Sequence, residues 1–212
     1  MNLALHILPA AQRALWPLLS AVPNDFTLYG GTAIALQLGH RQSVDFDFFA
    51  RTEFDPQQLL QSNVLLERAE VTAMAKNTLS VRWSSADDVP VLLSFFGVPK
   101  LPVLRAAWQI QAPAVALGHL LELAGMKAMV LQKRAEAKDY LDVHALIFQA
   151  KIDLATHLAA GLRLYPPHFA PEQTLKSLCY FADGNLATLA TSVRRDLAKA
   201  VRGVDLQKLP EL

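Results

Sequence analysis

The chain has a single cysteine, Cys179, among its 212 residues. One thiol cannot form an internal disulfide, and so few cysteines are typical of proteins in a reducing compartment. The sequence also lacks an apolar run of the roughly 20 residues that a membrane helix needs. Its start, interrupted by Pro9 and by polar side chains, lacks the basic segment and unbroken apolar core of a signal peptide. These absences predict a cytoplasmic protein with no membrane contact.

The sequence also has no marked excess of either sign of charge, because it contains 20 Lys and Arg residues and 19 Asp and Glu residues. A net charge of +1 predicts no general attraction to nucleic acid. A polynucleotide would have to be bound by a local basic patch, and basic residues on a helix also occur simply as a solvated face. The two candidate groups are Lys127, Lys133, Arg134 and Lys138, and Arg194, Arg195, Lys199 and Arg202.

Known zinc motifs are absent, since the sequence has neither H-E-x-x-H nor paired cysteines. The six histidines are scattered, and we interpret them as structural or surface residues. Hydrophobic residues make up 52% of the chain, so that its length suffices to bury a sizeable core as one large or two small domains.

The most informative segment that is present runs from Leu28 to Phe49. An apolar stretch, residues 26–29, predicts a buried strand, and the turn Gly30-Gly31-Thr32 breaks it and opens a helical stretch over 33–39. Two glycines let the backbone approach a ligand closely, and a helix N-terminus presents N–H groups to an anion. The pattern therefore predicts a phosphate-binding turn.

Two carboxylates follow that turn on a predicted strand. The alternation in VDFDFF places Asp45 and Asp47 on one face, and Val44, Phe46 and Phe48 on the other, buried face. Adjacent carboxylates repel each other unless a cation lies between them, and Mg²⁺ is commonly held by one or two carboxylates together with phosphate oxygens. The alternative is an ordinary turn followed by the solvated face of an edge strand.

A second group of polar residues lies in the helical part of the sequence. Lys127 falls within an apolar helical segment, where an ammonium group needs an anion, which either a triphosphate or an aspartate would supply. Asp139 and Asp142 are three residues apart and therefore share one helix face. Carboxylates at this spacing also occur simply as first-turn charges of a helix.

The remaining pattern predicts a mixed first half and a helical second half. We expect a helix over 3–20, another over 55–62, and a hairpin of strands 76–83 and 89–96 joined by a polar turn at 84–88. Prolines interrupt the segment 99–113, and the later helices are expected at about 116–134, 137–149, 152–160, 171–182 and 185–202.

The two groups of residues resemble motifs of the AbiEii-type nucleotidyltransferases. These are toxins of bacterial type IV toxin–antitoxin and abortive-infection systems within the polymerase-β nucleotidyltransferase superfamily. The family pattern is a small-residue turn followed by Asp-x-Asp, and later a lysine followed by Asp-x-x-Asp. The matching blocks span much of residues 28–148, and the C-terminal third carries no matching motif.

The resemblance implies an α+β fold, a polymerase-β-like mixed sheet with flanking helices followed by a C-terminal helical bundle. We expect a nucleotidyltransferase domain at 1–114 and a helical domain at 115–212 that contributes Lys127 and Asp139 to the site. Asp45 and Asp47 would hold Mg²⁺ or Mn²⁺, and Lys127 would contact phosphate. The further phosphate-binding candidates are Gly30, Gly31, Thr32, Arg41 and Ser43.

Two positions leave the roles of residues open. Polymerase-β-type enzymes usually carry a third carboxylate on a later strand, where this chain has Ser94. Asp139 could take the role of general base instead. Asp142 either orients Lys127 or simply supports the site from behind.

The resemblance further implies transfer of a nucleotide from an NTP to an acceptor such as tRNA, with a cognate antitoxin as partner. The same site would serve a small-molecule acceptor of the antibiotic type. A third alternative is a non-catalytic binding or regulatory protein that keeps the nucleotide fold, which Ser94 favours and the intact Asp45, Asp47, Lys127 and Asp139 oppose.

Overall fold

The computed structural model describes residues 2–84 and 89–212, so that most of the turn expected at 84–88 lies outside the described residues. The chain divides into two compact units. The first, here called the sheet unit, comprises Met1–Leu101 and Ala107–Gly118, and the second, the helical unit, comprises Pro102–Ala106 and His119–Leu212. Within the described ranges, no helix is both long and apolar enough to cross a membrane.

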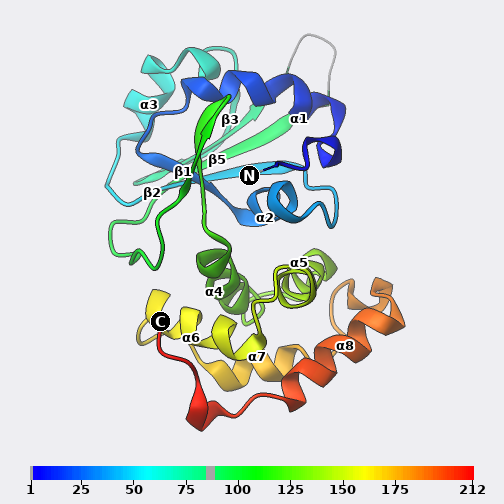
Figure 1. Ribbon diagram of the computed structural model, residues 1–212. Helices are drawn as coiled ribbons and strands as arrows, with labels where there is room; N and C mark the ends of the chain where they lie inside the picture. The colour runs from blue at the N-terminus through cyan, green and yellow to red at the C-terminus, as the bar shows by residue number, and fades with distance from the viewer. Residues whose placement is uncertain (1, 85–88) are drawn as a thin grey trace. The chain divides into compact units, whose positions relative to one another are not determined.

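A mixed sheet forms the centre of the sheet unit (Figure 1). Its strand order is β3-β4-β5-β2-β1-β7-β6 in the part of the chain that the structure describes. Strands β2 and β5 run parallel, as do β1 and β7, and the other neighbours are antiparallel. The strands are β1 (Phe26–Tyr29), β2 (Asp45–Ala50), β3 (Glu70–Ala75), β4 (Thr78–Trp83), β5 (Val91–Gly97), β6 (Trp108–Gln111) and β7 (Ala114–Leu117).

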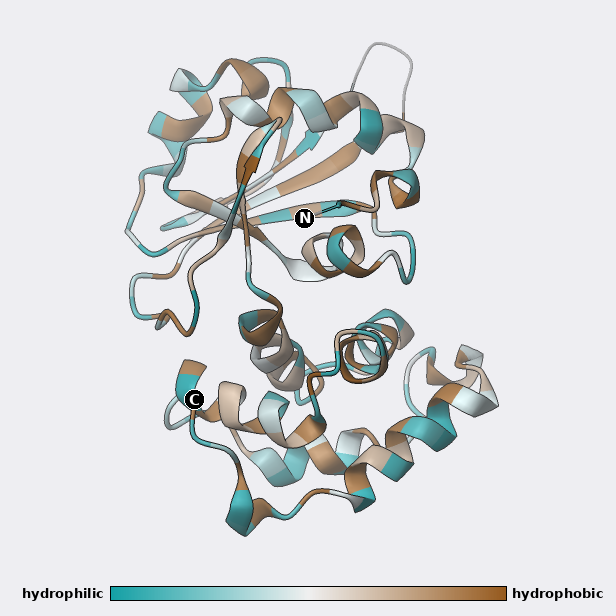
Figure 2. Cartoon of the chain, in the orientation of Figure 1, coloured by the Kyte–Doolittle hydropathy of each residue, from teal (hydrophilic) through white to brown (hydrophobic). Residues whose placement is uncertain are grey.

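Strand β2 carries the predicted Asp-x-Asp motif and lies in the middle of this sheet. Phe46 and Phe48 are fully buried, whereas Asp45 and Asp47 are half-buried, as the alternation predicts. Phe48 stacks on Phe95 of β5 with ring centroids 5.3 Å apart, and hydrophobic residues recur along the strands in Figure 2. Asp47 is paired with both β1 and β5, whereas the pairing of Asp45 is with β5 alone. The apolar face of β2 thus anchors the strand that presents the two carboxylates.

Helices flank the sheet, and α1 and α2 lie on opposite sides of it in Figure 1. Trp16 stacks on Phe46 and covers the face of the sheet on which Phe46 lies. Helix α2 follows β1 directly in the chain. The helical elements of the sheet unit are η1 (Leu5–Ile7), α1 (Ala10–Leu15), η2 (Trp16–Ala21), α2 (Gly30–Leu38), α3 (Pro56–Ser62) and η3 (Val64–Leu66), where η denotes a 3-10 helix.

Three expectations for the sheet unit were wrong. The helix expected over 3–20 is split into η1, α1 and η2, because Pro9 and Pro17 cannot donate the backbone hydrogen bonds of a continuous helix. Val44 precedes β2 and is 60% exposed rather than buried. Three strands were missed. They are β3, whose residues are all exposed, and the short pair β6 and β7.

The helical unit is built around α4, the helix that carries Lys127. Gly125 lets α4 approach α6 closely, because a Cβ atom at this position would lie 2.7 Å from the carbonyl carbon of Ala160. The elements of the unit are α4 (Leu120–Val130), α5 (Ala137–Phe148), α6 (Leu154–Leu164), α7 (Pro171–Ser177), η4 (Leu186–Thr188), α8 (Thr191–Arg202) and η5 (Leu206–Lys208). The helix expected over 116–134 therefore begins later, after β7.

A buried glutamate fixes the start of α4 to the connecting segment. The carboxylate of Glu122 accepts hydrogen bonds from the backbone N–H groups of Leu104, at 2.7 Å, and Arg105, at 3.3 Å. These bonds compensate for burying the charge, since Glu122 is only 1% exposed. The position of α4, and of Lys127 on it, is thereby tied to Pro102–Ala106 of the same unit.

The fully buried His157 of α6 is expected to make the stability of the protein dependent on pH. Its Nδ1 lies 2.9 Å from the carbonyl oxygen of Asp153, which can only accept a hydrogen bond, so that Nδ1 carries the proton. Burial lowers the pKa of His157 from 6.5 to about 4. The unfolded chain therefore binds more protons between these values, and the free energy of unfolding should fall by roughly 3 kcal/mol as the pH drops through this range.

Urea unfolding of the wild type and of His157→Leu at several pH values between 7 and 4 would check this prediction. The variant lacks the titrating group, so its stability should change less over the same range. Equal pH slopes in the two proteins would show that His157 is not the cause.

Candidate active site

The turn between β1 and α2 brings Gly30 against Asp47. Gly30 has φ +70°, a left-handed conformation that favours glycine. A Cβ atom at this position would collide with the Oδ2 atom of Asp47 and lie 3.2 Å from its Cγ. The backbone of the predicted phosphate-binding turn is therefore packed directly against one of the two predicted metal ligands.

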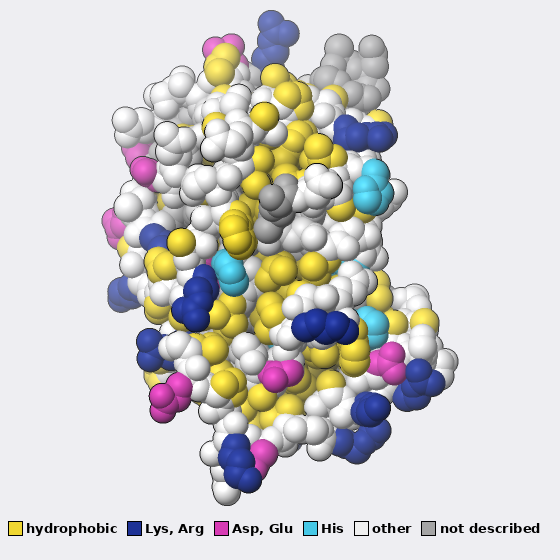
Figure 3. All heavy atoms as spheres, in the orientation of Figure 1, with side chains coloured by type: hydrophobic (Ala, Val, Ile, Leu, Met, Phe, Trp, Pro, Cys, Tyr) yellow, Lys and Arg dark blue, Asp and Glu magenta, His cyan; other side chains and the backbone are white. Residues whose placement is uncertain are grey.

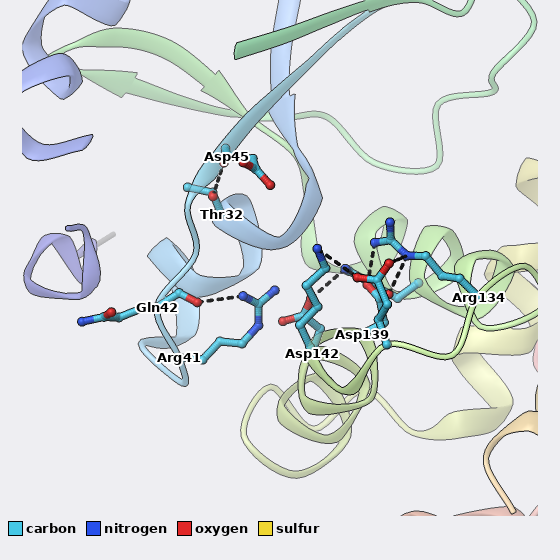
Figure 4. Close-up of polar contacts among 10 residues, drawn as sticks. Thr32, Arg41, Gln42, Asp45, Arg134, Asp139 and Asp142 are labelled. Atoms are coloured by element: carbon cyan, nitrogen blue, oxygen red, sulfur yellow. Dashed lines mark hydrogen bonds and ion pairs between the residues drawn. The ribbon is translucent and has the colours of Figure 1, made fainter. Parts of the chain in front are cut away.

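The second glycine of the turn lies against Arg41 and Ser43. A Cβ atom at Gly31 would contact the guanidinium of Arg41 and lie 3.2 Å from the hydroxyl oxygen of Ser43. Arg41 also donates a hydrogen bond of 2.7 Å to the carbonyl oxygen of Gln42 (Figure 4). The structure thus brings together three residues that sequence reasoning had placed at a phosphate, and a side chain at Gly31 would displace the guanidinium of Arg41.

Thr32 was expected to bind phosphate through its hydroxyl, but in the structure this hydroxyl is bonded to the protein backbone. The residue is only 1% exposed, and its hydroxyl donates a hydrogen bond to the backbone carbonyl of Asp45 (Figure 4). This bond joins the first turn of α2 to the start of β2. The side chain of Thr32 therefore positions Asp45, and the backbone N–H group of the helix N-terminus is what Thr32 can offer to an anion.

Ser94 occupies the position on β5 directly beside Asp47 in the parallel pairing of β2 and β5. It is buried, and its hydroxyl lies 3.1 Å from that of Ser80 on β4. The two hydroxyls satisfy each other by a hydrogen bond. The place expected for a third carboxylate thus holds a neutral side chain, which is a poor ligand for a hard divalent cation.

In the helical unit, Lys127 is paired with both predicted aspartates. Its ammonium nitrogen lies 2.7 Å from Oδ1 of Asp139 and 2.7 Å from Oδ2 of Asp142. The two carboxylates are fully buried and Lys127 is 6% exposed. Of the two anions that the sequence left open for Lys127, the structure supplies aspartate. The three-residue spacing of Asp139 and Asp142 on α5 places both carboxylates at the same ammonium group.

Arg134 joins this cluster, although sequence reasoning included it only in a basic patch. Its Nε donates to Oδ2 of Asp139 at 2.8 Å and its Nη2 to Oδ1 at 3.2 Å (Figure 4). Burial acts to raise the pKa of Asp139, but the hydrogen bonds and charges of Arg134 and Lys127 outweigh it and hold the pKa below its usual value. Asp139 is therefore a carboxylate that stays ionised. The sequence offered no helical spacing that predicts this contact, because Arg134 lies in the connection before α5.

The donor set for a metal ion is small. Among the residues that the structure describes, no group of three or more His, Cys, Asp or Glu side chains is arranged to hold one. Asp45 and Asp47 are two carboxylates on one face of β2, and Asp47 lies against the turn at Gly30. Mg²⁺ commonly takes one or two carboxylates and completes its coordination with water and substrate phosphate. The two aspartates fit this type of site.

The chemical capabilities of the two units differ. The sheet unit offers a glycine turn at a helix N-terminus, a guanidinium and two half-buried carboxylates, a combination suited to a polyphosphate with its cation. The helical unit offers an ammonium group and a guanidinium held by buried carboxylates. Phosphoryl chemistry depends chiefly on positioning and charge stabilisation, which groups of these kinds supply.

The fold is shared by two solved structures that are described as nucleotidyltransferases. One is an H. pylori protein assigned as a nucleotidyltransferase, with a TM-score of 0.56, 17% identity and coverage of 90% of both chains. The other is MenT4, a nucleotidyltransferase toxin from Mycobacterium tuberculosis, with a TM-score of 0.54, 16% identity and coverage of 92% of this chain and 83% of that one.

More particularly, residues 13–207 match the model of the nucleotidyl transferase AbiEii toxin family of type IV toxin–antitoxin systems, and the chain belongs to this family. A relative in Aquifex aeolicus, the uncharacterized protein aq_aa25, is 30% identical over 162 residues, which cover 76% of this chain and 75% of the relative. The family and the α+β fold with its mixed sheet agree with the expectations from the sequence.

Proposed function

We propose that this nucleotidyltransferase transfers a nucleotide from an NTP to an RNA acceptor such as tRNA, in a reaction that depends on Mg²⁺ or Mn²⁺. The observation that carries the proposal is the packing of the turn at Gly30 and Gly31 against Asp47, Arg41 and Ser43. Membership of the AbiEii family supports the nucleotidyltransferase and toxin parts of this function.

In this proposal the β- and γ-phosphates bind at the N-terminus of α2. The backbone N–H groups of Gly30, Gly31 and Thr32 would donate to them, and Arg41 would add a fixed positive charge, with Ser43 supporting the turn. Asp45 and Asp47 would hold the divalent cation, which when bound neutralises phosphate charge and polarises the α-phosphate. The hydrogen bond from Thr32 and the packing of Gly30 keep the two carboxylates in place.

The helical unit would contribute a cation and a base to the same reaction. Lys127 would stabilise the negative charge of the departing pyrophosphate, with Asp142 orienting its ammonium group. Asp139, kept ionised by Arg134 and Lys127, would accept a hydrogen bond from the acceptor hydroxyl. This assignment gives Asp139 the role that Ser94 on β5 cannot perform.

A toxin of this family implies a cognate antitoxin as partner, and we propose that both act in the cytoplasm. For contact with RNA, α8 is the stronger of the two basic groups predicted from the sequence. Arg195, Lys199 and Arg202 are exposed on this helix, and Figure 3 shows Lys and Arg side chains gathered over it. Residues at this spacing share one helix face, which suits a run of phosphates.

The test is transfer of labelled nucleotide from each of the four NTPs to total tRNA, compared between the wild type, Asp45→Asn and Asp47→Asn. Each variant keeps the shape of the side chain and removes the charge that holds the cation, so transfer should fall at least about 100-fold. Asp25→Asn, which neutralises an exposed carboxylate of the same unit, is the matched control and should keep its activity. Transfer that persists in both site variants would refute the proposed roles.

A further inference from the structure

The helical unit contains a cleft to which the residue roles proposed so far assign no function. It has a volume of about 260 Å³ and lies between the connection from α4 to α5, helix α7, and the segment that follows α7. Ligand sites for drug-sized molecules range from roughly 300 to 1,000 Å³, so this cleft suits one nucleoside rather than a whole triphosphate. Its polar lining includes Lys133, Arg134, Gln173, Tyr180 and Asp183.

The walls of the cleft are held by hydrogen bonds. The hydroxyl of Tyr140 donates to the carbonyl oxygen of Ser177 at 3.0 Å, and Asn185 Oδ1 accepts from the backbone N–H of Ala137 at 2.7 Å. Gly184, with φ +55°, packs against the carbonyl oxygen of Ala135. These contacts connect the three segments around the cleft, so that it exists before any ligand binds.

Three exposed side chains at the cleft can bind a ligand. Tyr180 is an aromatic residue that is 56% exposed. Lys133 and Asp183 are also exposed, and neither forms an ion pair within the described parts of the chain. Burial raises the pKa of Tyr140 to about 12, and the nearby negative charge of Asp183 contributes to this rise. An aromatic ring, a cation and a carboxylate are thus gathered around one small cleft.

These groups match the parts of a single nucleotide. An exposed aromatic ring is a stacking surface for a base, and a lysine is a partner for a phosphate. A carboxylate accepts hydrogen bonds from ribose hydroxyls, including the 2′-hydroxyl that distinguishes RNA from DNA. One unpaired cation balances the single charge of an internucleotide phosphate, whereas a triphosphate carries several charges.

Arg134 connects the cleft with the candidate active site. The same guanidinium that lines the cleft is bonded to both carboxylate oxygens of Asp139. A nucleotide in the cleft would therefore contact the same guanidinium that holds Asp139, the buried residue to which we assign the acceptor hydroxyl. We propose that this cleft binds the terminal nucleotide of a single-stranded RNA acceptor, with its base on Tyr180, its phosphate at Lys133 and its ribose at Asp183. The inference rests on the proposed function.

The experiment measures binding of a short, 5′-labelled single-stranded RNA to the full chain by fluorescence anisotropy, beside a DNA of the same sequence. Loss of the stacking ring in Tyr180→Ala should weaken RNA binding at least fivefold, and Tyr180→Phe should bind within twofold of the wild type. Lys133→Ala should also weaken RNA binding, whereas the matched control Lys176→Ala, an exposed lysine of α7 outside the cleft, should not. Asp183→Asn should narrow the preference for RNA over DNA.

Equal RNA affinity in the wild type and Tyr180→Ala would overturn the inference. NTP binding is measured in parallel. Weaker binding of NTP rather than RNA in Tyr180→Ala would assign the cleft to the donor nucleotide, which also contradicts the inference. A wild type that binds RNA through Tyr180 but binds no NTP would contradict the proposed function and leave the cleft as an RNA site, so the two failures are distinguishable.

Discussion

Replacing Lys127 by methionine is expected to lower the free energy of unfolding by about 3–5 kcal/mol. The side chain of methionine has a similar length but no charge, so the change leaves two fully buried carboxylates without the ammonium group that lies 2.7 Å from each. Arg134 still pairs with Asp139 in this variant. Urea unfolding followed by circular dichroism at pH 7 measures the effect.

The pH dependence of this variant provides an independent check. A buried carboxylate that has lost its cation has a folded-state pKa above the value in the unfolded chain, so protonation favours the folded state as the pH falls through that raised value. The difference in stability from the wild type should accordingly narrow between pH 7 and pH 5. Lys133→Met, at an exposed lysine, is the control and should change stability by less than about 0.5 kcal/mol. A similarly small effect of Lys127→Met would show that the buried ion pairs contribute little.

Changing Gly30 to alanine is expected to cost about 2–5 kcal/mol of stability and to abolish nucleotide transfer. A left-handed conformation costs roughly 1–2 kcal/mol for a residue with a Cβ atom, and overpacking adds about 1–3 kcal/mol. The new methyl group would collide with the carboxylate of Asp47 and displace it from the turn. Thermal or urea unfolding and the tRNA transfer assay measure the two effects separately.

Gly203→Ala is the matched control for this substitution. Gly203 follows α8 with φ −85°, and the nearest atom to an added Cβ is the carbonyl oxygen of Ala200 at 3.5 Å, an ordinary contact. The control should therefore lie within about 0.5 kcal/mol of the wild type. If Gly30→Ala kept both its stability and its transfer activity, the turn could not be the phosphate-binding element.

The parts of the fold that the sequence predicts well are those with strong local signals. The strand at 26–29 ends at two glycines, and β2 follows from strict alternation of aspartate and phenylalanine. The edge strand β3 could not be predicted in the same way, because all six of its residues are exposed and no buried face imposes a period of two. The N-terminal segment was wrongly predicted as a single helix. Its apolar helical pattern was given more weight than the two prolines that divide it.

In the candidate site, too, local spacing could be predicted from the sequence, whereas contacts between separate elements could not. The spacing of Asp139 and Asp142 predicted that they share one helix face, and the structure adds that they share Lys127. The contact of Arg134 with Asp139 depends on the bend between α4 and α5, which has no periodic signal. The hydroxyl of Thr32 could not be assigned to the backbone of Asp45 from sequence either, because that bond joins residues 13 positions apart. The catalytic and metal-binding roles of these residues stay predictions.

The pairing of β2 gives its two carboxylates unequal mechanical support. Asp47 is bonded into the sheet on both sides, whereas Asp45 begins the strand and is paired with β5 alone. Strand ends open by local fluctuations at a lower free energy than positions inside a sheet. One ligand of the proposed cation is therefore rigid, while the other can adjust to the size of the ion, with the hydroxyl of Thr32 limiting how far the strand end moves.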